Sequence, residues 1–222
     1  MKTQEIKIYV PQELSDITLG QYKKYEKILA TNTDDKNAER FLQQKMVEIF
    51  CGISLQEVQG MTLVDFNRIV VQLYDILIQQ PKLVKTFKMG SVEFGFIPNL
   101  EEMTFGEYVD LDTYIGDMQQ MEKAMAVLYR PIMNKHKDKY IIQEYQGELL
   151  QDEMLNMPMD AVVSSIVFFY NLGTELCNVM MNYTTNNQVL EYQHQLKDLQ
   201  KNGGGINQFI PLLPEILQEL NK

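Results

Sequence analysis

The sequence contains no tryptophan, two cysteines and two histidines among its 222 residues. Cys51 and Cys177 each lie in an apolar stretch of helical character, the usual setting of a reduced and buried thiol. His136 and His194 are far apart, and neither has a histidine or cysteine at the short spacings of zinc sites. We therefore expect no disulfide framework, no metal site and no cofactor.

Positive charge is also scarce, because 20 lysines and arginines face 30 aspartates and glutamates, for a formal net charge of -10. Such a surface repels a phosphate backbone and an anionic membrane, so neither nucleic acid nor a membrane is an expected partner. The most apolar run, residues 161–173, is shorter than the roughly 20 residues that cross a bilayer. The first residues carry no apolar signal segment, so we expect an intracellular protein.

Motifs of catalysis and nucleotide binding are missing as well. Glycines 203–205 are followed by isoleucine and asparagine rather than by the lysine of a P-loop. Asp110, Asp112 and Asp117 lack the glycine and glutamate that an EF-hand requires, and we interpret them as exposed acids of a capped helix. An enzyme whose site is assembled from scattered carboxylates, such as Asp110, Asp112 and Glu144, is an alternative, but the spacing of these residues matches no catalytic motif. The sequence favours a protein that is not an enzyme.

What is present predicts an α+β protein that is predominantly helical. Alternating apolar residues predict a strand at 6–10, a β-hairpin at 83–97 and a short strand at 139–145, and the first strand and the hairpin together form a small antiparallel sheet. Apolar residues at spacings of three and four, with Ser and Thr capping signals, predict the helices. These lie at residues 18–30, 41–52, from 54, from 62 to before 81, from 104 to about 130, at 159–183 and, with polar composition, at 186–201.

One segment occurs twice, since residues 16–22 (DITLGQY) match residues 102–108 (EMTFGEY). In both copies a threonine is the predicted N-cap, and the Gln or Glu three positions later completes a capping box. Leu19 and Phe105 fall in the first helical turn, where they can pack on the preceding strand. No local feature of the helix start requires a glycine at Gly20 or Gly106, so either a close backbone approach or chance explains these two glycines.

The duplication predicts two related halves, each with a strand and a capped helix. The first half covers residues 1–81 and the second covers residues 82–201. Residues 202–205 contain the three glycines and form a predicted hinge. Residues 206–222 follow as a predicted amphipathic C-terminal helix.

The C-terminal segment is the first candidate for partner binding, because a hinged amphipathic helix can bury its apolar side on another chain. Its alternative is a helix that folds back on its own domain. At the end of the long helix, an arginine complements the helix dipole and can reach a carboxylate such as Asp112, while Tyr and Arg are also common interface anchors. The predicted partner-binding residues are Phe209, Ile210, Leu213, Ile216, Leu217, Leu220, Tyr129 and Arg130.

Fourteen methionines form another noticeable group, with clusters at residues 118–125 and 154–159. Methionine-rich surfaces serve binding proteins that accept several partners, and methionines also fill irregular gaps in cores. We favour core filling.

Two stretches of the sequence carry a family resemblance. Residues 52–58 (GISLQEV), followed by residues 61–66 (MTLVDF), resemble the tail-assembly chaperones and the related baseplate-assembly proteins of long-tailed bacteriophages. Residues 128–132 (LYRPI), Tyr145 and residues 157–159 (MPM) are similar to proteins of phage structural operons. The glycine hinge and the second half depart from the smaller chaperones.

The resemblance implies a non-enzymatic role in which the protein binds other tail or virion proteins during phage tail or baseplate assembly, in the host cytoplasm. A structural component of the virion, located in the neck, baseplate or capsid interior, is the first alternative, and a cellular adaptor protein is the second. Self-association is left open.

Overall fold

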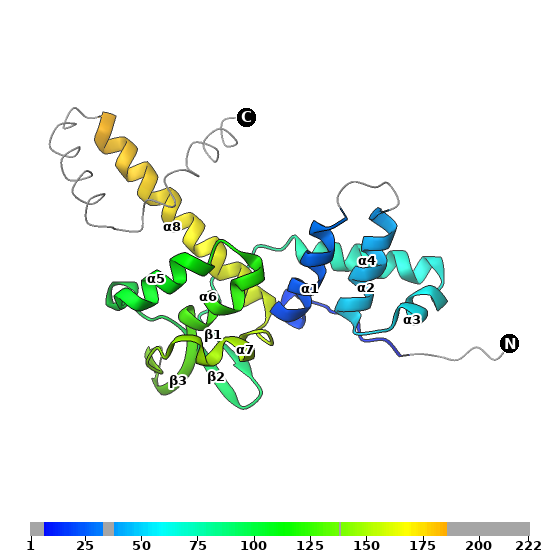
Figure 1. The fold of residues 1–222 in the computed structure, drawn as a ribbon, viewed down its shortest axis with the longest axis horizontal. Coiled ribbons are helices and arrows are strands. Elements are labelled where there is room, and N and C mark those ends of the chain that lie inside the picture. The colour runs from blue at the N-terminus through cyan, green and yellow to red at the C-terminus, as the bar shows by residue number, and fades with distance from the viewer. Residues whose placement is uncertain (1–6, 33–37, 138, 186–222) are drawn as a thin grey trace. The chain divides into compact units, whose positions relative to one another are not determined.

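The computed structural model describes residues 7–32, 38–137 and 139–185, and it confirms a mixed α+β protein dominated by helices (Figure 1). The described residues divide after Ser165 into two compact units, of which the second contains residues 166–185. Both sides of the predicted boundary at residue 81 belong to the first unit, and the limits of the two halves stay a prediction. The predicted hinge at 202–205 and the C-terminal helix at 206–222 lie outside the described residues.

The chain begins with helices and ends with a long helix, with the strands between. In chain order the elements are η1 (Leu14–Asp16), α1 (Leu19–Ala30), α2 (Ala38–Cys51), α3 (Leu55–Gly60), α4 (Leu63–Leu77), β1 (Thr86–Met89), β2 (Val92–Phe96), η2 (Leu100–Glu102), α5 (Phe105–Tyr114), η3 (Met118–Gln120), α6 (Met121–Leu128), β3 (Tyr129–His136), β4 (Lys139–Ile142), η4 (Gly147–Leu150), α7 (Gln151–Met154) and α8 (Met159–Thr185).

Four helices begin at the caps that the sequence predicts. Thr18, Ser54, Thr62 and Thr104 each accept a hydrogen bond from the backbone N–H three residues later. These bonds satisfy donors that the first helical turn leaves unpaired, which is why the chain enters each helix at that residue. At the other end of α2, Gly52 has φ +65°, a left-handed conformation that ends the helix as predicted.

The predicted hairpin is confirmed as β1 and β2, which pair antiparallel with Met89 opposite Val92. Gly90 in the turn has φ +58°. The sheet has four antiparallel strands in the order β1-β2-β3-β4. Tyr129, the first residue of β3, has a fully buried side chain that donates a hydrogen bond to the Val84 carbonyl at 2.7 Å.

One predicted strand is absent over the residues that the structure describes, and one observed strand was not predicted. Residues 7–10, the described part of the strand predicted at 6–10, have no strand partner in the structure and run as irregular chain. Conversely, β3 was not predicted, because Pro131 lacks the N–H that a ladder uses. That proline sits at the last pair of the short β2–β3 ladder, opposite Phe94, and its carbonyl still accepts from Gln143 N at 2.8 Å.

The prediction of one helix from 104 to about 130 is wrong. The chain leaves α5 after Tyr114, makes the short helix η3, and continues as α6. Asp117 is the N-cap of η3, and its carboxylate accepts from Gln119 N at 2.8 Å. Gly116 and the Asp117 cap interrupt the helical backbone, whereas the apolar spacing of three and four continues through the break and conceals it.

Methionines fill the core of the first unit, as the sequence analysis favoured. At most 2% of the surface of each of six methionine side chains is exposed, and these are Met46 on α2 and Met121, Met125, Met154, Met157 and Met159. Met121 and Met125 lie on α6, Met154 ends α7, Met157 precedes α8 and Met159 begins it. Ala124, Val127 and Ala161 on α6 and α8 are also fully buried. Unbranched, polarisable side chains such as methionine fill irregular gaps, and they therefore suit a region where several elements of different kinds pack together.

The second unit contains the described part of α8 from Ile166 to Thr185. The rings of Phe168 and Phe169 lie edge to face with centroids 5.3 Å apart. Thr174 donates its hydroxyl hydrogen to the Tyr170 carbonyl one turn earlier. Among the helices of the described residues, none combines the length and the apolar character that crossing a bilayer requires.

Candidate binding groove

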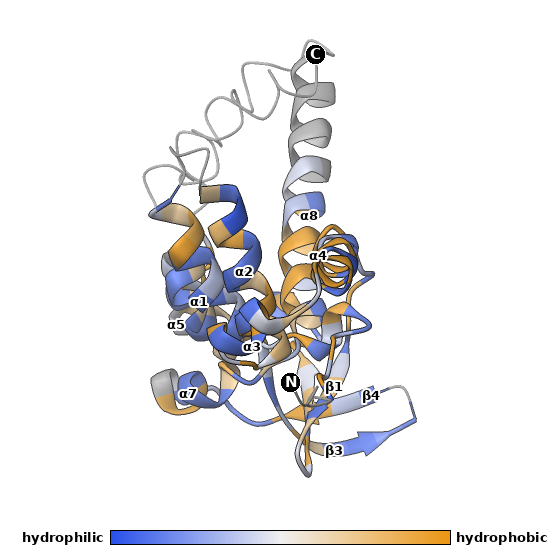
Figure 2. Ribbon diagram, turned by 90° about the vertical axis from the view of Figure 1, so that its right-hand side faces the viewer, coloured by the Kyte–Doolittle hydropathy of each residue, from blue (hydrophilic) through white to orange (hydrophobic). Residues whose placement is uncertain are grey.

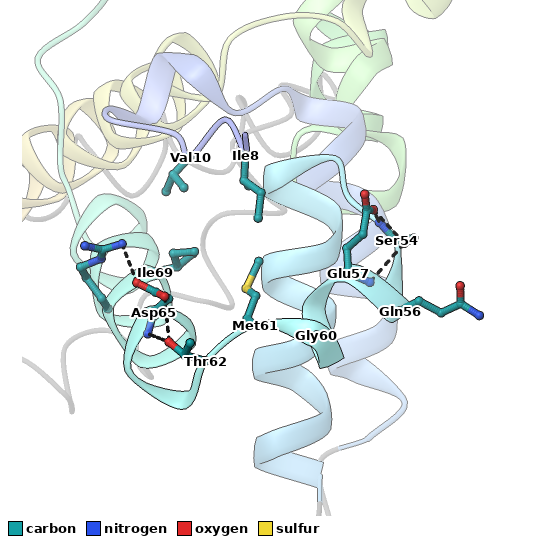
Figure 3. Close-up of a pocket in the computed structure, with 11 residues that line it drawn as sticks. Ile8, Val10, Ser54, Gln56, Glu57, Gly60, Met61, Thr62, Asp65 and Ile69 are labelled. Atoms are coloured by element: carbon teal, nitrogen blue, oxygen red, sulfur yellow. Dashed lines mark hydrogen bonds and ion pairs between the residues drawn. The ribbon is translucent and has the colours of Figure 1, made fainter. Parts of the chain in front are cut away.

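A groove of about 770 Å³ lies between the chain at residues 8–10, α3 and the beginning of α4 (Figure 3). Its apolar floor consists of Ile8, Val10, Met61 and Ile69, whose side chains point toward the open space. Its size is in the range of sites that hold a small molecule or a few side chains of a partner. The groove therefore is a candidate for binding.

The polar rim of the groove consists of side chains that already cap helices. Ser54 N donates to the Glu57 carboxylate at 2.7 Å, and Glu57 N donates to the Ser54 hydroxyl. The Thr62 hydroxyl donates to the Asp65 carboxylate at 2.7 Å, and Arg68 pairs with the same carboxylate at 2.9 Å. Each carboxylate thus bonds the hydroxyl of its own helix start and serves local structure.

The electrostatic state of the rim follows from these bonds. The backbone N–H of Ser54, and then its hydroxyl, donate to the Glu57 carboxylate and lower the pKa of that group from its ordinary value of 4.5. Glu57 is therefore ionised at neutral pH, and the rim holds two carboxylates against one guanidinium. An apolar floor with an acidic rim suits an apolar segment that carries a lysine or arginine beside it.

The chain at residues 8–11 makes a polar contact with α4 and another with η1. Gln72 on α4 donates its side-chain N–H to the Pro11 carbonyl at 2.7 Å. The Tyr9 hydroxyl bonds the Asp16 carboxylate, which raises the pKa of Tyr9. Although this segment makes no strand, its predicted alternation has a structural meaning, since Ile8 and Val10 face the groove while 63% of the Tyr9 surface is exposed.

Arg130, a predicted partner-binding residue, lies in a buried polar cluster instead. Its guanidinium pairs with the Glu107 carboxylate at 2.7 Å, and both side chains are at least nine-tenths buried. The other oxygen of that carboxylate accepts from Thr104 N at 2.6 Å in the predicted capping box. The sequence analysis anticipated a carboxylate partner for Arg130, but the partner is Glu107 and not Asp112.

The burial of this cluster corrects the prediction that Tyr129 and Arg130 anchor a partner. Tyr129 is fully buried and 7% of the Arg130 surface is exposed, so neither offers a contact surface. The Arg130 guanidinium also lies 5.9 Å from the ring of Tyr145, whose hydroxyl donates to Asp110 at 2.7 Å. Burial, followed by the bond to Asp110, raises the pKa of Tyr145. The cluster ties α5 to β3 and to the chain after β4.

The remaining candidate carboxylates have different local surroundings. Asp110 is engaged by Tyr145, whereas Glu144 is exposed and Asp117 caps η3. Burial raises the pKa of Asp112. Over residues 7–32, 38–137 and 139–185, no group of three or more His, Cys, Asp or Glu side chains is arranged to hold a metal ion. His194 and the C-terminal candidates Phe209, Ile210, Leu213, Ile216, Leu217 and Leu220 lie outside the described residues and stay predictions.

The sequence analysis did not identify the groove residues as a site. The local signals were present, because the alternation at 6–10 and the caps at Ser54 and Thr62 mark its walls. No pattern in the sequence, however, indicates that residues 8–10 return to α3 and α4, about fifty positions later. Comparison with protein-family models, with curated proteins and with solved structures found no match to this chain.

Proposed function

We propose that the protein is not an enzyme and acts by binding another protein during phage tail or baseplate assembly. The observation that carries the proposal is the groove at α3 and α4, with its apolar floor and its acidic rim. The Ser54, Glu57, Thr62 and Asp65 side chains take part in helix starts, so the groove offers an apolar floor and the negative charge of its rim as the means of recognition. The partner is a tail or virion protein that inserts an apolar segment with an adjacent basic residue.

The phage context rests on the resemblance of residues 52–58 and 61–66 to tail-assembly and baseplate-assembly proteins. The same two stretches supply six of the residues that line the groove, and these are Ser54, Gln56, Glu57, Met61, Thr62 and Asp65. The stretches that support the family thus coincide with the surface that supports binding. The cytoplasm of the host is the compartment in which such an assembly factor acts.

The test is affinity purification of the tagged full-length protein from infected cells, with co-purifying proteins identified by mass spectrometry. Met61→Asp places a charge on the groove floor and is expected to remove the specific partner. Leu149→Asp is the matched control, because 65% of the Leu149 surface is exposed and it lies outside the groove. A chain truncated after Asn202 tests the contribution of the predicted C-terminal helix in the same experiment.

Recovery of tail-gene products by the wild type and by Leu149→Asp, but not by Met61→Asp, supports the proposal. Recovery of no tail or virion protein by the wild type would contradict it. Mass spectrometry of purified particles then separates the two phage roles. Absence of the protein from particles identifies an assembly factor, and a constant copy number identifies a virion component.

A further inference from the structure

Helix α4 has two apolar faces, and only one of them is covered by the first unit. Ile69, Val70, Leu73 and Ile76 face the core, and each has at most 6% of its surface exposed. An apolar helix that is not fully covered is unusual at the surface of a monomer, because the exposed side chains keep their unfavourable contact with water. Figure 2 shows α4 almost end on, with much of its circumference in the orange of apolar residues.

The second face is a continuous stripe on the side of α4 opposite the core. It follows the seven-residue repeat of a helix-pairing seam and consists of Val64, Asn67, Val71, Tyr74 and Ile78, called the α4 seam below. The exposed fractions are 78% for Val64, 59% for Val71, 42% for Tyr74 and 75% for Ile78. A spacing of seven keeps Val64, Val71 and Ile78 nearly in line along the helix, as a second helix requires.

The charges beside the α4 seam indicate which helix fits. Arg68 and Asp75 both flank the seam on the same side, seven positions apart, and both are exposed. An identical helix that runs antiparallel, with a two-fold axis near Val71, brings Arg68 of each copy to Asp75 of the other. It also places Val64 toward Ile78 and Val71 beside its own counterpart. A parallel copy creates no such charge pairs.

We propose that a second copy of this chain covers the α4 seam, as an antiparallel helix pair with two-fold symmetry near Val71. The apolar seam residues supply the contact and the two Arg68–Asp75 pairs set the direction. The present partner of Arg68 does not prevent this arrangement. Arg68 pairs with Asp65 on the helix surface, where the two side chains are 73% and 48% exposed, and such a pair contributes little to stability.

The dimer leaves the groove open, because Thr62, Asp65 and Ile69 lie on a different side of α4 from the seam. Both surfaces use Arg68, since it lines the groove and would exchange Asp65 for Asp75 of the other copy. The inference does not depend on the proposed function. A seam of this length is small for a protein interface, so association belongs in the micromolar range or weaker and calls for measurements up to several hundred micromolar.

The experiment is sedimentation equilibrium of the full-length chain, from about 1 μM to 500 μM at 0.15 M salt. The mass of the wild type is expected to rise from 25.9 kDa toward twice that value. Val71→Glu sets two carboxylates against each other at the axis and should weaken dimerisation at least tenfold. Val109→Glu on α5 changes a 42% exposed valine outside the seam and should leave it unchanged.

Charge reversal tests the direction of the pair. Arg68→Asp and Asp75→Arg should each weaken the dimer several-fold, because each creates a like-charge contact across the axis. The double variant carries both reversals and should return the dimerisation constant to that of the wild type. All of these positions are exposed, and circular dichroism confirms that each variant is folded. A wild type that stays monomeric at 500 μM, a dimer that Val71→Glu does not weaken, or a double variant without recovery would overturn the proposal.

Discussion

At the residue scale, the arrangement with the highest energetic cost is the buried pair of Glu107 and Arg130. Both charges lie in the interior, where the loss of hydration of each ion is compensated chiefly by its charged partner. The carboxylate has two partners, Arg130 and the Thr104 N–H, whereas the Arg130 Nε has no hydrogen-bond partner within the described part of the chain. Removal of one member therefore leaves the other charge buried and unpaired.

We predict that Arg130→Met lowers the free energy of unfolding by about 3–5 kcal/mol, because it strands the buried Glu107 carboxylate. The double variant Glu107→Leu/Arg130→Met, which removes both charges, should be less destabilised than Arg130→Met. The control is Lys135→Met, since the Lys135 and Glu93 side chains keep 42% and 28% of their surface in solvent and their pair should contribute less than about 1 kcal/mol. Urea unfolding measures all three, and a double variant less stable than Arg130→Met would refute the explanation.

At the element scale, the duplicated segment folds into two capped helices with different surroundings. Both copies make the predicted capping box. Leu19 is fully buried although the described residues before it form no strand, whereas Phe105 has 78% of its surface exposed. The predicted packing of Phe105 on a preceding strand is therefore wrong, and Leu19 is buried without a strand in the described residues before it. A local motif determines the start of the helix, and the rest of the chain determines what covers it.

The two glycines of the duplication show the same difference. The Gly20 N–H donates to the Leu155 carbonyl at 2.7 Å, and a methyl group on Gly20 would stand 3.0 Å from that oxygen. A methyl group on Gly106 would meet no atom within 4 Å. The close backbone approach therefore explains Gly20, and the structure offers no such reason for Gly106.

We predict opposite effects of alanine at these two positions. Gly20→Ala should lower the free energy of unfolding by about 1–3 kcal/mol, because the backbone of residue 155 must shift to admit the new methyl group. Gly106→Ala should raise it by a few tenths to about 1 kcal/mol, because alanine restricts the unfolded chain more than glycine does. Thermal and urea unfolding of the pair measures both signs. Equal effects at the two sites would contradict the assigned role of Gly20.

At the scale of the whole molecule, hydrogen-bonded carboxylates and buried acids set how stability depends on pH. Hydrogen bonds and ion pairs lower the pKa of four carboxyl groups, with donors that are chiefly Gln12, Ser54, Lys135 and Gln120 for Asp16, Glu57, Glu93 and Asp117 respectively. Burial raises the pKa of the Cys51 thiol to about 11 and that of Tyr25 to about 12. The four carboxyl groups affect the stability of the fold at acidic pH, and Cys51 and Tyr25 affect it at alkaline pH.

The sign of each effect follows from proton linkage. The four carboxyl groups stabilise the folded chain above their ordinary pKa of 3.8 or 4.5, and this contribution is lost as the pH falls through their folded-state values. Cys51 and Tyr25 contribute below their ordinary values of 9.0 and 10.0, and their contribution is lost as the pH rises toward about 11 and about 12. Burial raises the pKa of Asp160, which opposes the first set.

We predict that the midpoint of urea unfolding is nearly constant between about pH 5 and pH 9 and falls on both sides of this range. Cys51→Ala should lower the midpoint at every pH, because it leaves a cavity, and should make its fall between pH 9 and pH 11 shallower. The steepness of this fall between pH 9 and pH 11 is the measurement that tests whether Cys51 titrates there. A variant that falls as steeply as the wild type would show that Cys51 does not titrate in this range.

The sequence alone determined four capped helix starts, the first hairpin and the mixed helical class, because caps, turn glycines and apolar periodicity act over a few neighbouring residues. It also indicated that Arg130 pairs with a carboxylate. Only the tertiary structure decided which carboxylate, which of the two repeated glycines is crowded, and which apolar side chains of α4 stay exposed. Those outcomes depend on residues far apart in the chain, and so does the groove, where residues 8–10 meet α3 and α4. Local spacing carries no information about such meetings, because they are set by how the whole first unit packs.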